Sequence, residues 1–144
     1  MNLNRRKFFG LNLLGLGIGL AAPALASSEI SLPTDTSDIY YTKDSVGRWN
    51  GKATTHLPNI DVSKTNGKIS VTVITAHEMK GYGHYIFKHV LLYQNHKFIA
   101  EHMFNPLEDK VPQSSFTLDA HYSGILYALS MCNKHDVWLS SIMV

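Results

Sequence analysis

The feature that most constrains the fold is a series of short segments in which apolar and polar residues alternate. The clearest is Ile69-Ser-Val-Thr-Val73, whose spacing is typical of a strand with one buried face. Turn residues recur about every eight to twelve positions, and no segment carries a long apolar stripe at helical spacing. The chain is therefore predicted to be all-β, a seven-stranded antiparallel sandwich after about residue 48. The other expected strands are His84 to Tyr93, Lys97 to Phe104, Ser115 to Leu118, Gly124 to Met131 and Val137 to Val144.

The N-terminus predicts an export signal. Arg5 and Arg6 begin a twin-arginine pattern, residues 8–22 are mostly apolar, and Ala24-Leu25-Ala26 resembles a cleavage site. Because the apolar stretch is shorter than the ~20 residues of a membrane span, a cleaved signal is favoured over an anchor. We predict a periplasmic protein in three parts: a signal peptide at 1–26, an extended leader at 27–47 and the sandwich at 48–144.

The net charge gives no reason to expect nucleic-acid binding. The predicted signal contains Arg5, Arg6 and Lys7 and no acidic residue, so its removal leaves 10 of 13 basic residues against 11 acidic ones. The basic balance of the full chain therefore belongs to the signal. Contact with a membrane is expected only through that signal.

Cys132 is the only cysteine of the chain. In an oxidising compartment a lone thiol is buried, pairs between chains, or binds something. The segment Cys132-Asn-Lys-His135 places a thiolate and an imidazole three residues apart after an expected strand, and this pair of donors suits zinc, copper or iron. Taken alone, a buried thiol beside a surface histidine explains the segment equally well.

Three further histidines stand at the ends of predicted segments. His77 and His84 flank a glycine-rich loop between two expected strands, so both can face one point. His56 precedes Leu57-Pro58, and the proline should hold Leu57 extended beside a candidate ligand. The other four are not expected to be ligands, because a strand histidine defaults to an exposed face and a turn histidine to solvent: His89, His96, His102 and His121.

A hydrolase function has no support in the sequence. There is no G-x-S-x-G segment, no phosphate-binding glycine loop and no pair of carboxylates at acid/base spacing. His77-Glu78 continues as Met-Lys-Gly, which does not complete the zinc-protease pattern H-E-x-x-H.

Taken in chain order, these residues resemble the iron site of the superoxide reductases, the family of desulfoferrodoxin and neelaredoxin. The resemblance is carried by His56-Leu-Pro, His77, His84-Tyr-Ile and the block from Cys132 to Trp138, C-N-K-H-D-V-W. It implies an immunoglobulin-like β-sandwich that holds one iron, Fe2+ or Fe3+, per chain. The implied metal ligands are His56, His77, His84 and His135 around the iron, with Cys132 as axial ligand.

The chain departs from the family pattern near the metal. Members commonly place Glu-Lys before the first histidine, where this chain has Thr54-Thr55. Glu78 stands where a proline is usual, and Asp136 where a glycine is usual. The additional four-cysteine domain of some members is excluded, because the chain has one cysteine.

The resemblance implies a one-electron reduction of superoxide to hydrogen peroxide. A cation near the iron would attract superoxide, and Lys80 is our first choice for this catalytic role ahead of Lys52 and Lys134, because it lies in the loop between two ligands. The expected partners are superoxide and a periplasmic electron donor that the sequence does not identify. A second copy of the chain, in a homo-oligomer, is a further candidate partner.

Two other functions stay open at this point. One is a non-catalytic periplasmic metal-binding or electron-transfer protein that uses the same residues. The other is a metal-free binding subunit, because Val73 to Leu118 also faintly resembles the sandwich subunit of periplasmic sulfur-oxidation carriers. Iron, copper or no metal in the purified protein would separate the three.

Overall fold

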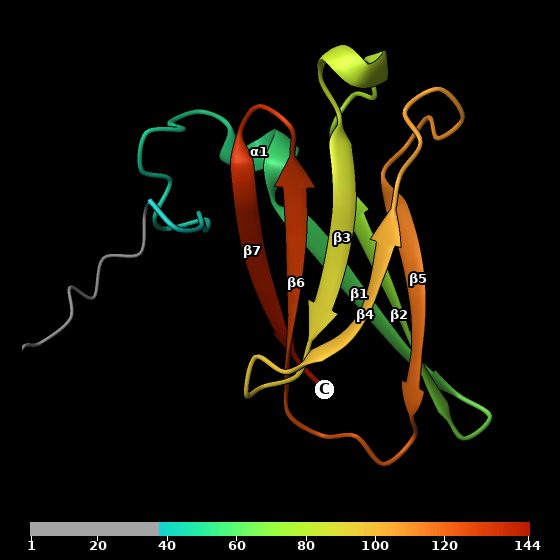
Figure 1. Ribbon diagram of the computed structural model, residues 1–144. Coiled ribbons are helices and arrows are strands. Elements are labelled where there is room, and N and C mark those ends of the chain that lie inside the picture. Colours follow the sequence, from blue (N-terminus) through green and yellow to red (C-terminus); the bar gives the residue numbers. More distant parts are fainter. Residues whose placement is uncertain (1–37) are drawn as a thin grey trace, which may run out of the picture. The chain divides into compact units, whose positions relative to one another are not determined.

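A computed structural model describes residues 38–144, so the predicted signal peptide and most of the predicted leader lie outside the described residues. From residue 38 onward the chain forms seven strands in two antiparallel sheets (Figure 1). This confirms the predicted all-β class. No helix within residues 38–144 is both long and apolar enough to cross a membrane.

The two sheets contain three and four strands. Their orders are β1-β2-β5 and β4-β3-β6-β7. A four-residue helix, α1 (Ala53–His56), precedes β1, and a short 3-10 helix, η1 (Gly81–Gly83), lies between β2 and β3. The strands are β1 (Pro58–Thr65), β2 (Lys68–Thr75), β3 (Ile86–Leu92), β4 (Phe98–Met103), β5 (Gln113–Asp119), β6 (Ile125–Cys132) and β7 (Asp136–Met143).

Strand β1 was not among the expected segments. Only Ile60 and Val62 mark its inward face, and polar residues surround them. It lies at the edge of its sheet, where it pairs with β2 along its whole length, from Pro58 opposite Thr75 to Thr65 opposite Lys68. The partner strand therefore defines this element more than its own weak alternation does.

The apolar core lies between the sheets. Alternate residues of β2 and β5 point inward and meet apolar side chains of β3 and β6. This is the arrangement expected when strands bury one face against a second sheet. The buried members are Ile69, Val71, Val73, Leu91, Phe116, Leu118, Leu126 and Ala128.

A polar network also crosses this core, and its centre is His89. The His89 ring is fully buried, with Nε2 2.9 Å from Thr75 Oγ1 and Nδ1 2.8 Å from Ser114 Oγ. Thr75 Oγ1 donates in turn to Ser130 Oγ at 2.8 Å. The network therefore joins β2 and β5 of one sheet to β3 and β6 of the other.

The expectation that His89 lies on an exposed face is wrong. The pairing of β3 with β6 is irregular between Ile86 and Lys88. Such a bulge changes which face the following residues occupy, so both Ile86 and His89 point inward. A neutral ring with both nitrogens hydrogen-bonded can be buried at low cost, and burial lowers the pKa of His89 to about 4.

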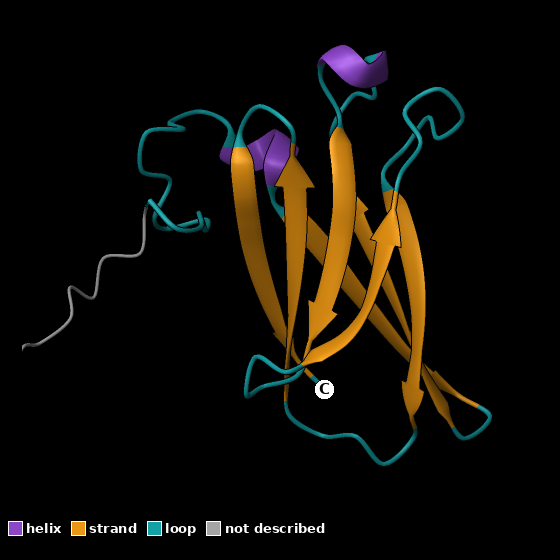
Figure 2. Cartoon of the chain, viewed as in Figure 1, coloured by secondary structure: helices purple, strands orange, loops and turns teal. Residues whose placement is uncertain are grey.

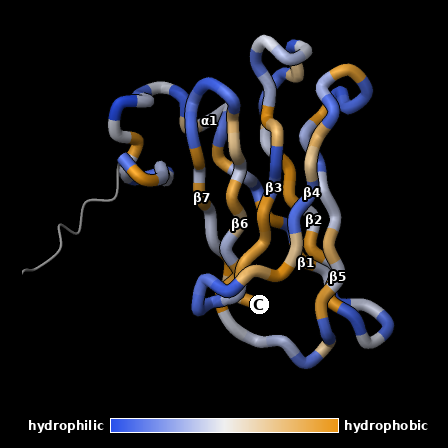
Figure 3. Tube along the Cα trace, viewed as in Figure 1, coloured by the Kyte–Doolittle hydropathy of each residue, from blue (hydrophilic) through white to orange (hydrophobic). Residues whose placement is uncertain are grey.

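Several connections meet at one end of the sandwich. Helix α1, the η1 loop and the β6–β7 turn lie together there, while the C-terminus lies at the opposite end (Figures 1 and 2). The β6–β7 turn is hydrophilic (Figure 3). Each of these connections carries at least one of the histidines singled out above.

Candidate metal centre

His56 ends helix α1 and is almost completely buried. Its Nδ1 lies 3.0 Å from the carbonyl oxygen of Lys52 and 2.9 Å from Thr55 Oγ1. Because a carbonyl can only accept, Nδ1 carries the ring proton, and the lone pair of Nε2 is left to face inward. Leu57 is extended, as predicted from the proline after it.

His77 and His84 are brought together by the loop that η1 shapes. The His77 amide donates to the carbonyl of Thr75 at 2.8 Å, and the Lys80 amide donates to that of His84 at 3.0 Å. Gly81 takes a positive φ of 57° within this turn, a conformation that glycine adopts readily. The chain thus doubles back, and the two Nε2 atoms lie 3.1 Å apart.

Cys132 and His135 are placed by the hairpin between β6 and β7. Cys132 ends β6 and pairs with Asp136, the first residue of β7. Asp136 has a φ of 59°, which lies in the left-handed region, and it directly follows the three-residue loop 133–135. The amide of Lys134 donates to Cys132 Sγ at 3.4 Å. This compact turn leaves Sγ 3.7 Å from His135 Nδ1.

Asn133 ties this hairpin to the loop of His84. Its Oδ1 accepts from the Tyr85 amide at 3.0 Å, and its Nδ2 donates to the Tyr82 carbonyl at 3.1 Å. The Asn133 amide also donates to the Tyr85 carbonyl at 3.2 Å. Asn133 was not predicted to have a role, although it stands inside the C-N-x-H block of the sequence.

The structure brings together all five residues that the sequence predicts as metal ligands. One donor atom from each lies within 4.8 Å of all the others, and we call this group the five-donor cluster: His56, His77, His84, Cys132 and His135. His135 Nδ1 lies 3.0 Å from Nε2 of both His56 and His84. Neighbouring imidazole centroids are 4.5–4.8 Å apart, and one diagonal, between His56 and His84, is 6.1 Å. The four rings therefore surround a common point.

The donor spacing fits a metal ion. Two nitrogens at about 2.1 Å from one ion and at right angles to each other lie about 3.0 Å apart. The three shortest nitrogen–nitrogen distances in the cluster are 3.0, 3.0 and 3.1 Å. Four imidazoles and a thiol are borderline-to-soft donors, which suit iron, copper or zinc rather than magnesium or calcium.

The protonation of the cluster also suits metal binding. Burial lowers the pKa of His56 to about 4. Burial is likewise the main cause that lowers the pKa of His77, His84 and His135, so these rings are neutral at neutral pH and can act as ligands. Burial raises the pKa of the Cys132 thiol, which would release its proton on binding a metal.

A cavity of about 300 Å³ opens onto three of the histidines. Its wall includes Lys80, whose Nζ lies 2.7 Å from Glu78 Oε2 in an exposed ion pair. Lys52 also lines the cavity, whereas Lys134 does not. All three lysines lower the pKa of His84, so their charges act on the same end of the cluster. The lining residues are Lys52, Thr55, His56, Ala76, His77, Glu78, Lys80 and His84.

Comparison with known proteins agrees with this geometry. The desulfoferrodoxin family model matches residues 48–141. A superoxide reductase (neelaredoxin) from Ignicoccus hospitalis is 27% identical, with a TM-score of 0.62, over 74% of this chain and 94% of that one. A superoxide reductase from Nanoarchaeum equitans shares the fold at 20% identity and a TM-score of 0.56, over 63% of this chain and 94% of that one. A search of curated proteins found no match. The match over residues 48–141 shows that this chain belongs to the desulfoferrodoxin family.

Proposed function

We propose that this protein binds one iron ion in the five-donor cluster and reduces superoxide to hydrogen peroxide. The observation that carries the proposal is the convergence of four imidazoles and one thiol beside an open cavity. Its family and the name of its relative from Ignicoccus hospitalis, a superoxide reductase, support the same chemistry.

Five residues of the chain would bind the iron, and a backbone amide beside them would tune the electron donation of the thiolate. Nε2 of His56, His77 and His84, Nδ1 of His135 and Sγ of Cys132 are the donor atoms that face one another. A bound iron would supply one electron, and with two protons superoxide becomes hydrogen peroxide. The Lys134 amide donates to Cys132 Sγ, and a hydrogen bond to a thiolate ligand adjusts its electron donation.

The cavity residues would bring the anion to the cluster. Lys52 and Lys80 place positive charge on the cavity wall, which raises the encounter rate of an anionic substrate. We propose Lys80 as the main steering residue, with its charge reduced by the pairing with Glu78. Thr55, which stands where relatives commonly have lysine, instead contacts His56 Nδ1 at 2.9 Å and fixes a ligand ring.

The proposed location rests on the N-terminal sequence. We propose that the chain reaches the periplasm by the twin-arginine route with its metal already bound, and that the signal ends at Ala26. With Arg5→Lys and Arg6→Lys together, precursor should accumulate in the cytoplasm. N-terminal sequencing of the exported wild type should begin at Ser27, and a sequence that begins at Met1 would contradict cleavage.

Metal analysis and absorption spectra of protein folded in the cell test the chemistry. We expect one iron per chain and, after oxidation, a visible thiolate-to-iron charge-transfer band that Cys132→Ser abolishes. Pulse radiolysis of the reduced protein should show consumption of superoxide with hydrogen peroxide as product and no release of dioxygen. Copper in place of iron would favour an electron-transfer protein, and metal-free protein would favour a binding subunit.

A further inference from the structure

The segment Tyr41–Trp49, here called the strap, packs against the hairpin that carries two members of the five-donor cluster. Tyr41 is 1% exposed. Its amide donates to the Val137 carbonyl at 2.9 Å, and its carbonyl accepts from the Leu139 amide at 2.8 Å. The strap therefore lies along the edge of β7, and most of it precedes the residues that match the family model.

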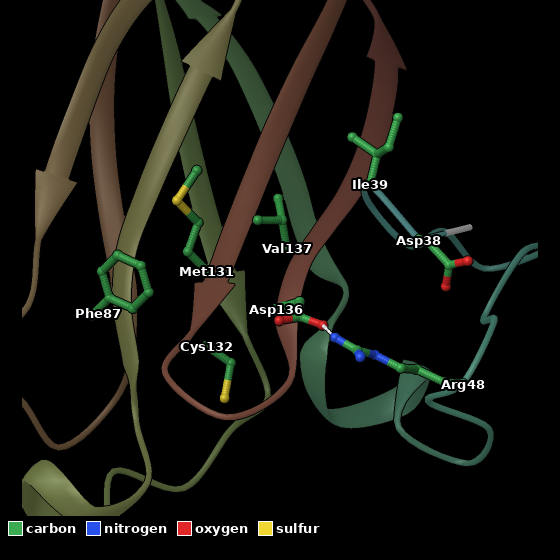
Figure 4. A pocket seen from close by; sticks show the side chains of 8 residues that line it. All are labelled: Asp38, Ile39, Arg48, Phe87, Met131, Cys132, Asp136 and Val137. Atoms are coloured by element: carbon green, nitrogen blue, oxygen red, sulfur yellow. Dashed lines mark hydrogen bonds and ion pairs between the residues drawn. The ribbon is translucent and has the colours of Figure 1, made fainter. Parts of the chain in front are cut away.

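Asp136 receives the side chains of the strap. Arg48 forms an ion pair with Asp136 Oδ2, Trp49 Nε1 donates to the same oxygen at 2.9 Å, and the Tyr41 hydroxyl donates to it at 3.5 Å. Figure 4 shows Arg48 reaching from the strap to Asp136 at the start of β7. The Arg48 guanidinium also lies over the Trp49 ring, 5.0 Å from its centroid. One carboxylate thus gathers three donors from the strap.

The backbone conformation at Asp136 indicates that its side chain has a structural role. Its φ of 59° lies in the left-handed region, where a residue with a Cβ atom is less favoured than glycine. Aspartate tolerates this region better than most residues, yet glycine would fit without strain. What the aspartate adds over glycine is the acceptor for the strap.

The strap and the hairpin together fix the ring of His135. The Trp49 ring meets the His135 ring edge-on, with centroids 4.7 Å apart and planes at 90°. Within the hairpin, Trp138 Nε1 donates to the backbone carbonyl of His135 at 2.8 Å, and the Trp138 ring packs against that of Tyr41 at 5.5 Å. Asp136 accepts a hydrogen bond from Trp49 and follows His135 in the chain, so movement of the strap would release the Trp49 contact with this ring and the packing of Tyr41 against Trp138.

The same ion pair borders a second cavity. This cavity of about 310 Å³ is lined in part by Arg48, Asp136, Met131 and Cys132 (Figure 4). Arg48 and Asp136 form part of its wall, so their separation would widen the opening beside the cysteine. Access of water to a metal–thiolate bond is one of the properties that the surroundings of a metal control.

We infer that Asp136 is a positioning residue, which ties the strap to the ligand hairpin and so holds His135 and Cys132 in their metal-binding arrangement. The inference rests on the proposed function only in that the hairpin must bind a metal. It predicts that the strap is needed for full metal affinity although it contributes no ligand.

The test uses Co(II) added to metal-free protein, because a cobalt–thiolate absorption band reports Cys132 directly. Asp136→Gly removes the acceptor and relieves the backbone, and it should weaken Co(II) binding about ten-fold or more, within the range for residues that support ligands. Asp136→Asn keeps the shape and one acceptor oxygen and should fall between this variant and the wild type. The matched control is Asp119→Asn, because the Asp119 carboxylate is also a hydrogen-bond acceptor, here for the His121 amide, and lies at the opposite end of the sandwich.

Hydrogen exchange in the metal-free proteins supplies a readout independent of the metal. The amides of Tyr41 and Leu139 should exchange at least ten-fold faster in Asp136→Gly than in the wild type. Their exchange rates should be unchanged in Asp119→Asn. If Asp136→Gly did not fold, Arg48→Gln would carry the test, because Arg48 is exposed and its loss leaves the hairpin intact.

Three results would each have a distinct meaning. Wild-type Co(II) affinity in Asp136→Gly would overturn the inference, even with faster exchange in the strap, because Asp136 would then hold the strap alone. Unchanged exchange would also overturn it, because the strap would not depend on Asp136. A wild type that gave no cobalt–thiolate band would instead reject the proposed function, while the exchange data would still show whether Asp136 holds the strap.

Discussion

The histidines described above form two groups that are built on opposite principles: His89 within β3, and the four histidines of the five-donor cluster at one end of the sandwich. His89 finds a hydroxyl for each ring nitrogen, from Thr75 and Ser114. In the five-donor cluster, ring nitrogens face other ring nitrogens at 3.0–3.1 Å. His77 shows the contrast most clearly, because its Nδ1 is buried without a hydrogen-bond partner among the described residues.

The contrast separates a structural histidine from a ligand. A neutral imidazole has one donor and one acceptor, and His89 uses both within the protein. Because Thr75 Oγ1 donates to Ser130, it accepts from His89 Nε2, which leaves His89 Nδ1 to accept from Ser114. Nitrogens that converge with too few protons among them favour binding of an ion, and of these two groups the five-donor cluster has that property.

Loss of a ligand should produce the largest difference between the two sets. Cys132→Ser removes the thiolate, so we expect metal affinity to fall by on the order of 100-fold or more, beyond the effect of losing a supporting residue. His89→Leu should keep full metal stoichiometry. Competition with a chelator, read by metal content, checks both variants. Equal metal loss in the two would remove the distinction drawn here.

Acid should destabilise the metal-free protein through both sets. For His89 the folded pKa of about 4 lies below the unfolded value of 6.5, so the unfolded state binds more protons between these values. The contribution of His89 to the free energy of unfolding is therefore fully present above pH 6.5 and is lost as the pH drops toward 4. As the pH falls below this range, protonation linked to His89 alone lowers the free energy of unfolding by about 3 kcal/mol. The cluster histidines lower it in the same direction.

Urea unfolding from pH 7.5 to 4 measures this dependence. With metal bound, the loss should begin at lower pH for the cluster, because the metal competes with protons for the ligand nitrogens. The slope due to His89 should remain in the metal-bound protein and vanish in His89→Leu. A His89→Leu variant with the wild-type pH dependence would contradict the assigned pKa.

The His89 network should matter for stability rather than for the metal. His89→Leu leaves Ser114 without its partner, while Thr75 keeps Ser130. One buried hydroxyl left unpaired costs about 1–3 kcal/mol, so we expect a loss of about 2 kcal/mol in the free energy of unfolding. The exposed His121→Leu is the control, and its change should stay within about 0.5 kcal/mol.

The smallest expected effect concerns access. The five-donor cluster opens onto a cavity with Lys80 on its wall, whereas His89 is enclosed. Because Glu78 already offsets the charge of Lys80, Lys80→Ala should slow superoxide reduction only a few-fold and flatten its dependence on ionic strength.

Lys88→Ala is the matched control, because Lys88 pairs with Glu101 at 3.0 Å in β3 and β4 and lines neither cavity next to the cluster. Pulse radiolysis across a salt series measures both variants. Equal rates and salt dependence in Lys80→Ala and the wild type would remove Lys80 as the steering residue.

The fold class could be predicted from period-two alternation, because strands that bury one face must show it. The five candidate ligands could be proposed because their residue types, order and positions at strand ends resemble a known pattern. The burial of His89 could not, because a bulge in β3 changes the face it occupies. The role of Asp136 also escaped, because its donors come from Tyr41, Arg48 and Trp49, 87 or more residues away in sequence.

The long sequence separation within the five-donor cluster affects how a bound metal would stabilise the folded sandwich. His56 and His135 are 79 residues apart along the chain, yet their facing nitrogens are 3.0 Å apart. With a single cysteine, the chain cannot form an internal disulfide. A metal held at both positions would take that place as a cross-link and close most of the sandwich into one loop, which restricts the unfolded chain. Removal of the metal should therefore weaken β1 and β7, which begin next to the two ends of that loop, as much as it weakens the turns that touch the ion.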